Sequence, residues 1–224
     1  MIKKVDASTL ILDHSISRRN YDRLSRWYDL LESSWERKPR EATLASLEAA
    51  PGDMILEIGC GTGNSLSDLS NEATDSGCVF GIDLSTGMLR QTRQRLIREK
   101  SSPRIFLTQA DAVLLPFEDN VFDIIFLSFT LELFNPPEIP FVLAECRRLL
   151  KPGARLGIVA VSRSGGWKWM IQVYESLHHA FPKVVDCSPI NLILLIAEAG
   201  FRPVNQRTFS LFGIGVESVT ADKK

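Results

Sequence analysis

The chain has 224 residues and a mass of 25.1 kDa, which suits one domain with a full hydrophobic core. Hydrophobic residues make up 45% of the sequence and charged residues 24%, which excludes intrinsic disorder as the main state. The 26 Lys and Arg residues nearly cancel the 27 Asp and Glu residues. The resulting net charge of −1 gives no reason to expect a nucleic-acid partner.

The cysteines and the apolar runs indicate a cellular compartment. The 4 cysteines lie far apart and form no C-x-x-C pair, which argues against a local zinc or redox motif and favours reduced thiols. The longest apolar stretches, residues 124–129 and 190–197, are too short to cross a bilayer. Asp6 interrupts the amino terminus before any apolar run of signal-peptide length. We expect a cytoplasmic protein without a transmembrane segment, and the sequence leaves peripheral membrane contact open.

The first part of the chain reads as a helical segment ahead of the main domain. Aromatic and leucine residues recur at three- and four-residue spacing within residues 17–31, which is typical of an amphipathic helix. Pro39 interrupts this pattern, and we expect a second helix over residues 40–49 that a Pro-Gly pair ends. We predict that residues 1–50 form an amino-terminal helical lid and that residues 51–224 form the main domain.

Within the main domain, short apolar runs alternate with helical segments. Apolar strands separated by helices imply a parallel sheet that is covered on both faces. Glycines separate two last strand-like runs, residues 204–212 and 216–220, which predicts an antiparallel hairpin. We therefore expect an α/β fold with a doubly wound, mostly parallel seven-stranded sheet, an antiparallel last strand and helices on both faces. The alternating strands are expected at residues 54–58, 79–82, 105–107, 124–129 and 156–161.

The expected helices carry signals at their ends. Asn64 is the expected N-cap of a helix that reaches about Ala73, and Ser85 is the expected N-cap of the next helix. A third helix, residues 138–150, should end at a Lys-Pro-Gly sequence, with the lysine placed to favour the helix dipole. A last helix is expected over residues 189–199.

The densest chemical signal is the sequence ILEIGCGTGN at residues 55–64. A strand ends at Ile58 and a glycine turn leads into a helix, so that backbone N–H groups can face a ligand. The dinucleotide fingerprint G-x-G-x-x-G/A would need Gly or Ala where Asn64 stands, so the spacing argues against a dinucleotide. Asp83, at the end of the next strand, could take the ribose hydroxyls of either kind of ligand.

Five motifs, in order along the chain, resemble those of the class I S-adenosylmethionine-dependent methyltransferases. ILEIGCGTG resembles their motif I, GIDLS their ribose-binding segment and QADAVLLPF their adenine-contacting segment. FDIIFLSFTLELF resembles their fourth strand, and LKPGARLGIVAVS resembles their fifth strand with its preceding turn. The matches cover about residues 52–162. The resemblance implies a Rossmann-like methyltransferase fold and S-adenosyl-L-methionine as the cofactor.

The resemblance also implies roles for the residues at the first two strand ends. Gly59, Gly61 and Gly63 would line the methionine and ribose parts of the cofactor. Glu57 would hold the loop and the cofactor's amino group, and Asp83 would bind the ribose hydroxyls.

Further contacts are implied for the adenine ring and the methionine amine. Leu84 and Met88 would pack on adenine, although a methionine at helical spacing can equally be an ordinary core residue. Asp111 would accept a hydrogen bond from the adenine N6 amine, and the Ala112 N–H would reach a ring nitrogen. The carbonyl of Ser128 would meet the methionine amine.

Methyl transfer from a sulfonium makes few chemical demands on a protein. The leaving group is already activated, so the protein must mainly hold donor and acceptor together and exclude water. A base is needed only if the acceptor must lose a proton. The candidate bases are Glu132, His178 and His179, each of which could instead be a salt-bridge, capping or solvent-facing residue. The sequence shows no metal-ligand spacing, and no metal is expected.

An Asn-Pro-Pro sequence at residues 135–137 resembles part of the N-P-P-Y motif of amino-group methyltransferases. That motif lies directly at the end of the fourth strand, whereas here TLELF intervenes and Glu138 replaces the aromatic residue. We interpret the segment as a loop.

The segments YDR at residues 21–23 and WYD at residues 27–29 resemble the opening of the ubiquinone/menaquinone-biosynthesis C-methyltransferases and of the bacterial phospholipid N-methyltransferases. The resemblance implies that Tyr28 and Tyr21 contact the cofactor from a lid, the alternative being core packing of an amphipathic helix. An insertion, residues 162–188, carries further aromatic residues and is expected to contribute to the acceptor pocket.

These features predict a methyltransferase that acts on a small apolar or amphipathic acceptor, such as a quinone-like ring. Methylation of a phospholipid ethanolamine head group is the alternative within this class. A dinucleotide-binding oxidoreductase and a non-catalytic S-adenosylmethionine binder are the alternatives from other classes. The sequence does not predict an oligomeric state.

Overall fold

The computed structural model describes residues 34–74, 76–101, 104–162, 189–211 and 213–224. In this part of the chain, seven strands form one sheet in the order β3-β2-β1-β4-β5-β7-β6. The strands are β1 (Met54–Ile58), β2 (Cys78–Asp83), β3 (Ile105–Gln109), β4 (Phe122–Ser128), β5 (Leu150–Ser162), β6 (Phe201–Leu211) and β7 (Ile214–Lys223).

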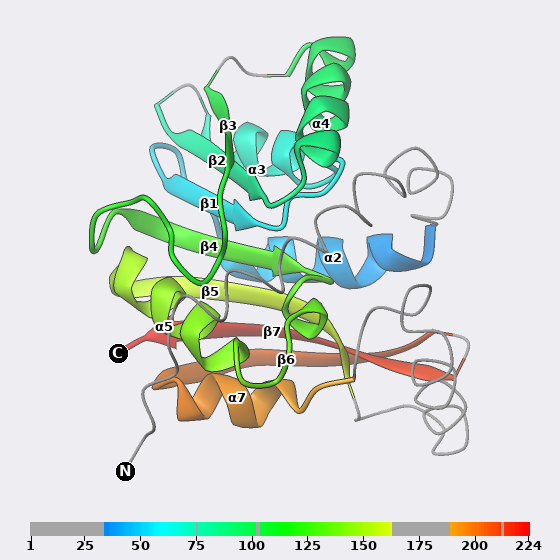
Figure 1. Cartoon of the computed structure of the whole chain (residues 1–224), viewed down its shortest axis with the longest axis vertical. Coiled ribbons are helices and arrows are strands. Elements are labelled where there is room, and N and C mark those ends of the chain that lie inside the picture. Colours follow the sequence, from blue (N-terminus) through cyan, green and yellow to red (C-terminus); the bar gives the residue numbers. More distant parts are fainter. Residues whose placement is uncertain (1–33, 75, 102–103, 163–188, 212) are drawn as a thin grey trace.

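Helices cover both faces of this sheet, as Figure 1 shows. One face is covered by α2, α3 and α4 and the other by α5 and α7, which confirms the doubly wound arrangement. These elements are α2 (Ser34–Leu47), α3 (Leu66–Ala73), α4 (Thr86–Glu99), the short 3-10 helix η1 (Leu131–Leu133), α5 (Ile139–Leu149) and α7 (Leu192–Glu198).

The direction of the strands confirms the expected mixed sheet. Strands β1 to β5 pair in parallel, whereas β7 runs antiparallel to both of its neighbours, β5 and β6. A tight turn at Gly213, whose φ is 85°, connects β6 and β7. The predicted hairpin at the end of the chain is therefore present.

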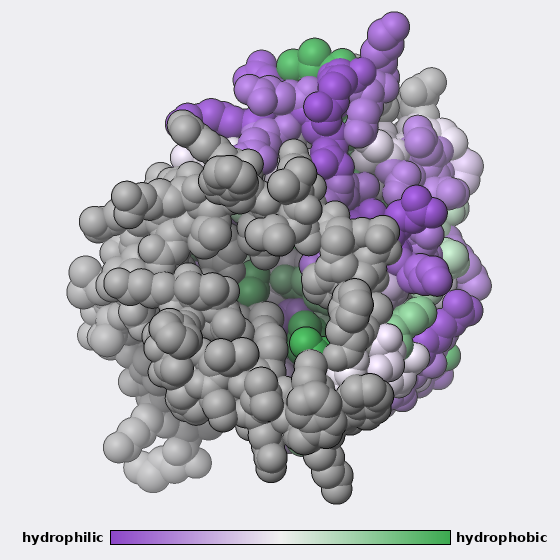
Figure 2. Space-filling model, turned by 90° about the vertical axis from the view of Figure 1, so that its right-hand side faces the viewer, coloured by the Kyte–Doolittle hydropathy of each residue, from purple (hydrophilic) through white to green (hydrophobic). Residues whose placement is uncertain are grey.

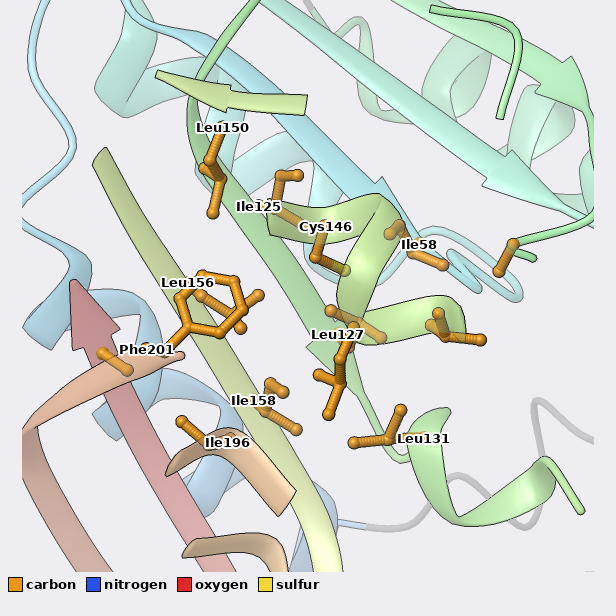
Figure 3. Packing of buried hydrophobic residues seen from close by; sticks show 14 of the residues in the cluster. Ile58, Ile125, Leu127, Leu131, Cys146, Leu150, Leu156, Ile158, Ile196 and Phe201 are labelled. Carbon is orange, nitrogen blue, oxygen red and sulfur yellow. The ribbon is translucent and has the colours of Figure 1, made fainter. Parts of the chain in front are cut away.

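The larger hydrophobic cluster lies between the sheet and helices α5 and α7. In Figure 3, Ile125 and Leu127 of β4 lie near Cys146 of α5, and Ile158 of β5 lies near Ile196 of α7. All five side chains are almost completely buried. This packing fixes β4 and β5, whose carboxyl ends border the candidate site.

Helix α2 differs from its expected form, since it begins at Ser34 and contains Pro39. Proline lacks an N–H, but its fixed φ is helical, so a helix can continue through it at some cost. The helix packs on β5 and β7, where the Thr43 hydroxyl lies 2.6 Å from that of Ser218. Residues 34–47 therefore belong to the layer that covers the sheet, and the predicted lid would have to come from earlier residues.

The helix ends show one wrong prediction and one correct one. The helix after the glycine turn begins at Leu66, and Asn64 does not cap it. Its amide oxygen instead accepts a hydrogen bond from Arg95 of α4. Ser85 caps α4 as expected, because its hydroxyl accepts a 3.2 Å hydrogen bond from the Met88 N–H.

The Lys-Pro-Gly sequence belongs to a strand and not to a helix end. Helix α5 ends at Leu149 and β5 begins at the next residue. The Lys151 ammonium group lies 2.7 Å from the Asp123 carboxylate of β4. It therefore forms an ion pair between two strands and does not interact with the helix dipole as expected.

Two predicted segments lie outside the described residues. They are the lid helix with Tyr21 and Tyr28, and residues 163–188 with His178 and His179. Within the described part of the chain, no helix is long and apolar enough to cross a membrane.

Candidate functional site

The candidate site lies where the parallel strands end. Strand β1 lies between β2 and β4. The chain adds β2 and β3 on one side of β1 and then β4 and β5 on the other side, so the strand order reverses at β1. Open parallel sheets bind ligands outside the carboxyl ends of their strands at such a switch point. Figure 2 faces this side, and the described residues at its upper right are mainly hydrophilic. The sheet thus brings the predicted residues of β1 to β4 to one edge.

The turn after β1 has a backbone conformation with positive φ angles, which its glycines can adopt without steric strain. Gly59, Gly61 and Gly63 have φ values of 69°, 51° and 83°, in the left-handed region that favours glycine. A Cβ atom on Gly59 would lie 2.4 Å from Thr130, and one on Gly63 would lie 2.6 Å from Thr92. A Cβ atom on Gly61 would have no atom of the described residues within 4 Å. Two glycines therefore make room for protein side chains, whereas Gly61 faces space that no described residue fills.

Hydrogen bonds from neighbouring elements hold the turn in place. The Gly61 N–H donates to Asp83 Oδ2 at 3.0 Å, and the Gly61 carbonyl accepts from the Thr92 hydroxyl at 2.6 Å. The Cys60 N–H donates to the carbonyl of Ile82 at 2.9 Å. The turn is thus attached to both β2 and α4.

Asp83 uses both of its carboxylate oxygen atoms to hold the glycine turn and the segment after β2. Its Oδ1 atom accepts from the Ser85 N–H at 2.8 Å, while Oδ2 accepts from Gly61. A carboxylate offers about four lone-pair sites in total. The side chain is partly exposed. A carboxylate of this kind beside the open face of Gly61 suits the two adjacent hydroxyls of a ribose.

Glu57 and Cys60 lie on the protein side of the turn. The Glu57 side chain is 2% exposed, and its carboxylate is close enough to influence the Cys60 thiol. Burial raises the pKa of Cys60 well above its usual value, and the charges of Glu57 and Asp83 raise it further. The thiol is therefore protonated and unreactive at neutral pH, although it lies in the middle of the site.

The segment after β3 is tied to the end of β2. Gln109 donates to the carbonyl of Leu84 at 2.8 Å, and Asp111 Oδ1 accepts from the Val113 N–H at 3.1 Å. Met88 and Ala112 are 3% and 6% exposed. The contacts of these residues with adenine stay predictions, and the burial of Met88 leaves it little surface for a ligand.

Thr130 is a residue of the site that the sequence analysis missed. Its hydroxyl lies 3.0 Å from the carbonyl of Ser128 and 3.4 Å from that of Gly59, and so connects β4 to the glycine turn. The chain between them is bent, since Phe129 has a φ of 50° and donates to the carbonyl of Val159 at 2.8 Å. A threonine after a strand gives no sequence signal for such a contact, because it depends on two segments meeting in space.

Glu132 lies in η1, just beyond the end of β4. Its Oε1 atom accepts a 2.9 Å hydrogen bond from the Val161 N–H of β5, and its side chain is 2% exposed. Burial raises the pKa of Glu132 to about 7, although the N–H groups of Val161 and of Glu132 itself act in the opposite direction. The carboxyl group can therefore exchange a proton near neutral pH.

The Asn-Pro-Pro segment is occupied by its own turn. Glu138 Oε2 accepts hydrogen bonds from the Asn135 backbone N–H and side-chain amide at 3.0 and 3.1 Å. The segment therefore forms the expected loop. Among the described residues, no group of His, Cys, Asp and Glu side chains could hold a metal ion.

A family model described as a methyltransferase domain matches residues 55–153. The chain is 30% identical to a demethylmenaquinone methyltransferase of Beutenbergia cavernae, over 85% of this chain and 84% of that protein. It is 33% identical to a ubiquinone/menaquinone biosynthesis C-methyltransferase of Paraburkholderia phytofirmans, over 72% of this chain and 63% of that protein. Several other curated relatives are matched over only 59% to 64% of their length.

The fold has counterparts among solved structures. One is a methyltransferase in complex with the Trm112 activator of Haloferax volcanii, which aligns over 91% of this chain and 97% of that one. The TM-score is 0.70 and the sequence identity is 17%, so this likeness concerns the fold alone.

Proposed function

Because this chain belongs to the S-adenosylmethionine-dependent methyltransferases, in the family of the demethylmenaquinone methyltransferases, we propose that it methylates a ring carbon of a small quinone-like acceptor. The structural observation that carries the proposal is the pairing of Gly61 and Asp83 at the switch point of the sheet. The ring acceptor is inferred from the names of the relatives. A net charge of −1 agrees with a small acceptor and not with a nucleic acid.

Different residues of the site would bind different parts of the cofactor. Asp83 would accept hydrogen bonds from the ribose hydroxyls, and the open face of Gly61 would let the cofactor lie against the backbone. Asp111 would face the adenine amine, and the Ser128 carbonyl would accept from the methionine amine. When bound, the cofactor supplies a methyl group on a positively charged sulfur atom.

The acceptor would enter beyond the ends of β4 and β5, next to the expected position of the methyl group. Hydroquinones are the reactive form, because a ring hydroxyl makes the adjacent ring carbon electron-rich. The ends of both strands are fixed by the buried core below them, so the site offers a rigid edge against which donor and acceptor can be aligned.

The test uses the full chain, S-adenosylmethionine and a reduced naphthoquinone with a short prenyl tail, under anaerobic conditions. We expect mass spectrometry to detect one added methyl group on a ring carbon, and fragmentation to distinguish it from an oxygen-linked methyl group. Phosphatidylethanolamine vesicles and NAD serve as comparison ligands. Methylation of the lipid amine alone, or tight binding of NAD without S-adenosylhomocysteine binding, would contradict the proposal.

A further inference from the structure

The segment after β4 connects the glycine turn to the end of β5. Thr130 contacts the carbonyl of Gly59 on one side, and two residues later the Glu132 carboxyl binds the Val161 N–H on the other. Ser128 is the last β4 residue that pairs with β5, opposite Val159. Beyond this last pair, the Glu132 side chain, and not the β4 backbone, accepts the hydrogen bond from the Val161 N–H of β5. It lies at the border between the expected cofactor and the expected acceptor.

Only one of the two oxygen atoms of Glu132 has a role within the described structure. Oε1 accepts from Val161, whereas Oε2 is buried and has no hydrogen-bond partner among the described residues. An unsatisfied buried carboxylate oxygen costs free energy and is rare in folded proteins. A residue needed only to cap the Val161 N–H could be a glutamine or a threonine, which would avoid burying an ionisable group. The second oxygen therefore indicates a ligand.

We propose that Glu132 is the general base of methyl transfer, with Oε2 accepting the proton of the acceptor's ring hydroxyl. This role rests on the proposed function. As the O–H proton moves to Oε2, the electron pair of the adjacent ring carbon forms a bond to the methyl carbon. The methyl–sulfur bond breaks and its electron pair stays on sulfur. The ring carbon then loses its hydrogen as a proton, the ring oxygen regains one, and one proton in total is released to water.

The surroundings of Glu132 suit a base that works near neutral pH. Its pKa of about 7 results from burial, opposed by two backbone N–H groups, with no charged side chain among the causes. Among the described residues, the other carboxyls that are at most 3% exposed are Glu57 of β1, Glu138, which binds Asn135, and Glu217, which binds Ser162 and Gln206. A base with a pKa near the working pH is largely deprotonated and still basic enough to receive a proton.

Glu217 offers a matched control. It is 2% exposed like Glu132, but its two oxygen atoms accept from the Ser162 hydroxyl at 2.6 Å and from the Gln206 amide at 3.3 Å. Glu132→Gln and Glu217→Gln therefore remove the same charge from equally buried positions. Only the first changes a carboxyl group with an oxygen atom that lacks a hydrogen-bond partner among the described residues.

The experiment measures methylation of the reduced naphthoquinone against pH for the wild type, Glu132→Gln, Glu132→Asp and Glu217→Gln. We expect kcat of the wild type to rise through about pH 7 and then level off. Glu132→Gln should lose this rise and be slower by a factor of about 100 or more, Glu132→Asp should recover part of the rate, and Glu217→Gln should behave like the wild type. Calorimetric affinity for S-adenosylhomocysteine should be the same in all four proteins.

A readout without turnover is the pH dependence of 1,4-dihydroxynaphthalene binding in the presence of S-adenosylhomocysteine. Binding to the wild type should change through about pH 7, and binding to Glu132→Gln should not. A Glu132→Gln protein with the wild-type rate and pH profile would overturn the role of Glu132 and leave the proposed function intact. A wild type that methylates no hydroquinone would overturn the proposed function itself. Loss of S-adenosylhomocysteine binding in Glu132→Gln would show a structural role instead.

Discussion

The Glu132 carboxyl accepts a backbone hydrogen bond and is also buried. Burial of its charged form opposes folding. Burial raises the pKa of Glu132 from an ordinary value of 4.5 to about 7 in the folded protein. The folded state therefore holds the proton more tightly than the unfolded state does. The Glu132 carboxyl does not affect the free energy of unfolding well below pH 4.5. That free energy then falls as the pH rises, and the decrease caused by Glu132 is complete above about pH 7.

The first prediction follows from this sign. Glu132→Gln keeps an oxygen atom for the Val161 N–H and cannot ionise, so it should be more stable than the wild type above about pH 7. The difference should approach about 3 kcal/mol at alkaline pH and vanish near about pH 4. Urea unfolding at several pH values measures it. A stability difference that does not vary with pH would contradict the raised pKa.

The second prediction concerns Asp83, whose expected ribose contacts are two charge-assisted hydrogen bonds worth about 1.5–3 kcal/mol each. Asp83→Ala should weaken S-adenosylhomocysteine binding by a factor of about 10 or much more. It also removes the bond to the Gly61 N–H, so part of the loss would come from the turn. Calorimetry measures the affinity, and the control is Asp119→Ala, which removes a 67% exposed carboxylate ahead of the start of β4. Unchanged affinity in Asp83→Ala would exclude this strand end as the ribose site.

The third prediction separates backbone strain from ligand contact at Gly61. Gly61 and Gly153 both have positive φ, 51° and 76°, and a Cβ atom on either would meet no described residue within 4 Å. Alanine should cost about 1–2 kcal/mol of stability at each position. Only Gly61→Ala should also weaken S-adenosylhomocysteine binding, because its Cβ atom would occupy the cofactor's space. Equal affinities of the two variants would show that Gly61 does not border the cofactor.

At the scale of the elements, α2 is attached to the sheet by an unusually polar contact. Thr43 and Ser218 are 0% and 3% exposed, and their hydroxyls lie 2.6 Å apart. The Thr43 hydroxyl also lies 2.9 Å from the carbonyl of Pro39. These bonds fix the rotation of the helix about its axis, which apolar packing alone specifies less strictly.

The fourth prediction tests this contact with a double-mutant cycle. Thr43→Val leaves the Ser218 hydroxyl buried with one partner fewer and should cost about 1–3 kcal/mol. Adding Ser218→Ala should restore part of that loss, because no unsatisfied hydroxyl then remains at the pair. Urea unfolding gives the coupling free energy, and S-adenosylhomocysteine affinity should not change. Strictly additive losses would show that the two hydroxyls do not interact.

At the scale of the whole molecule, the sequence predicts the architecture because buried strands and amphipathic helices have different hydrophobic periods. Apolar runs such as residues 124–129 predict central parallel strands, and the glycines near residue 213 predict the final hairpin. The start of α2 was not predictable, because Pro39 signals a break and only packing against β5 and β7 overcomes that preference. Element types follow from local pattern, whereas their ends depend on tertiary contacts.

The candidate site was predictable to the extent that its residues follow strands. Asp83 and Gly61 come at strand ends, so a parallel sheet brings them to one edge. Thr130 has no such signal, because its role depends on how closely β4 approaches the glycine turn. The same holds for Asn64, which carries a capping signal but meets Arg95 from a helix that is distant in sequence.

Hydrogen bonds within the protein hold the glycine turn in place. Gly61 donates to Asp83 and accepts from Thr92, and Cys60 donates to the carbonyl of Ile82. The groups assigned to this edge would contact ribose, adenine and the amino acid part, which the methyl donor shares with its demethylated product. Under the proposed function, such a turn cannot tell the two apart, and only the charge and the methyl group on sulfur distinguish them. Product would then compete with donor at similar affinity. The rate in a cell would follow the ratio of the two compounds, so that removal of the spent donor would control this protein as strongly as supply of the fresh one.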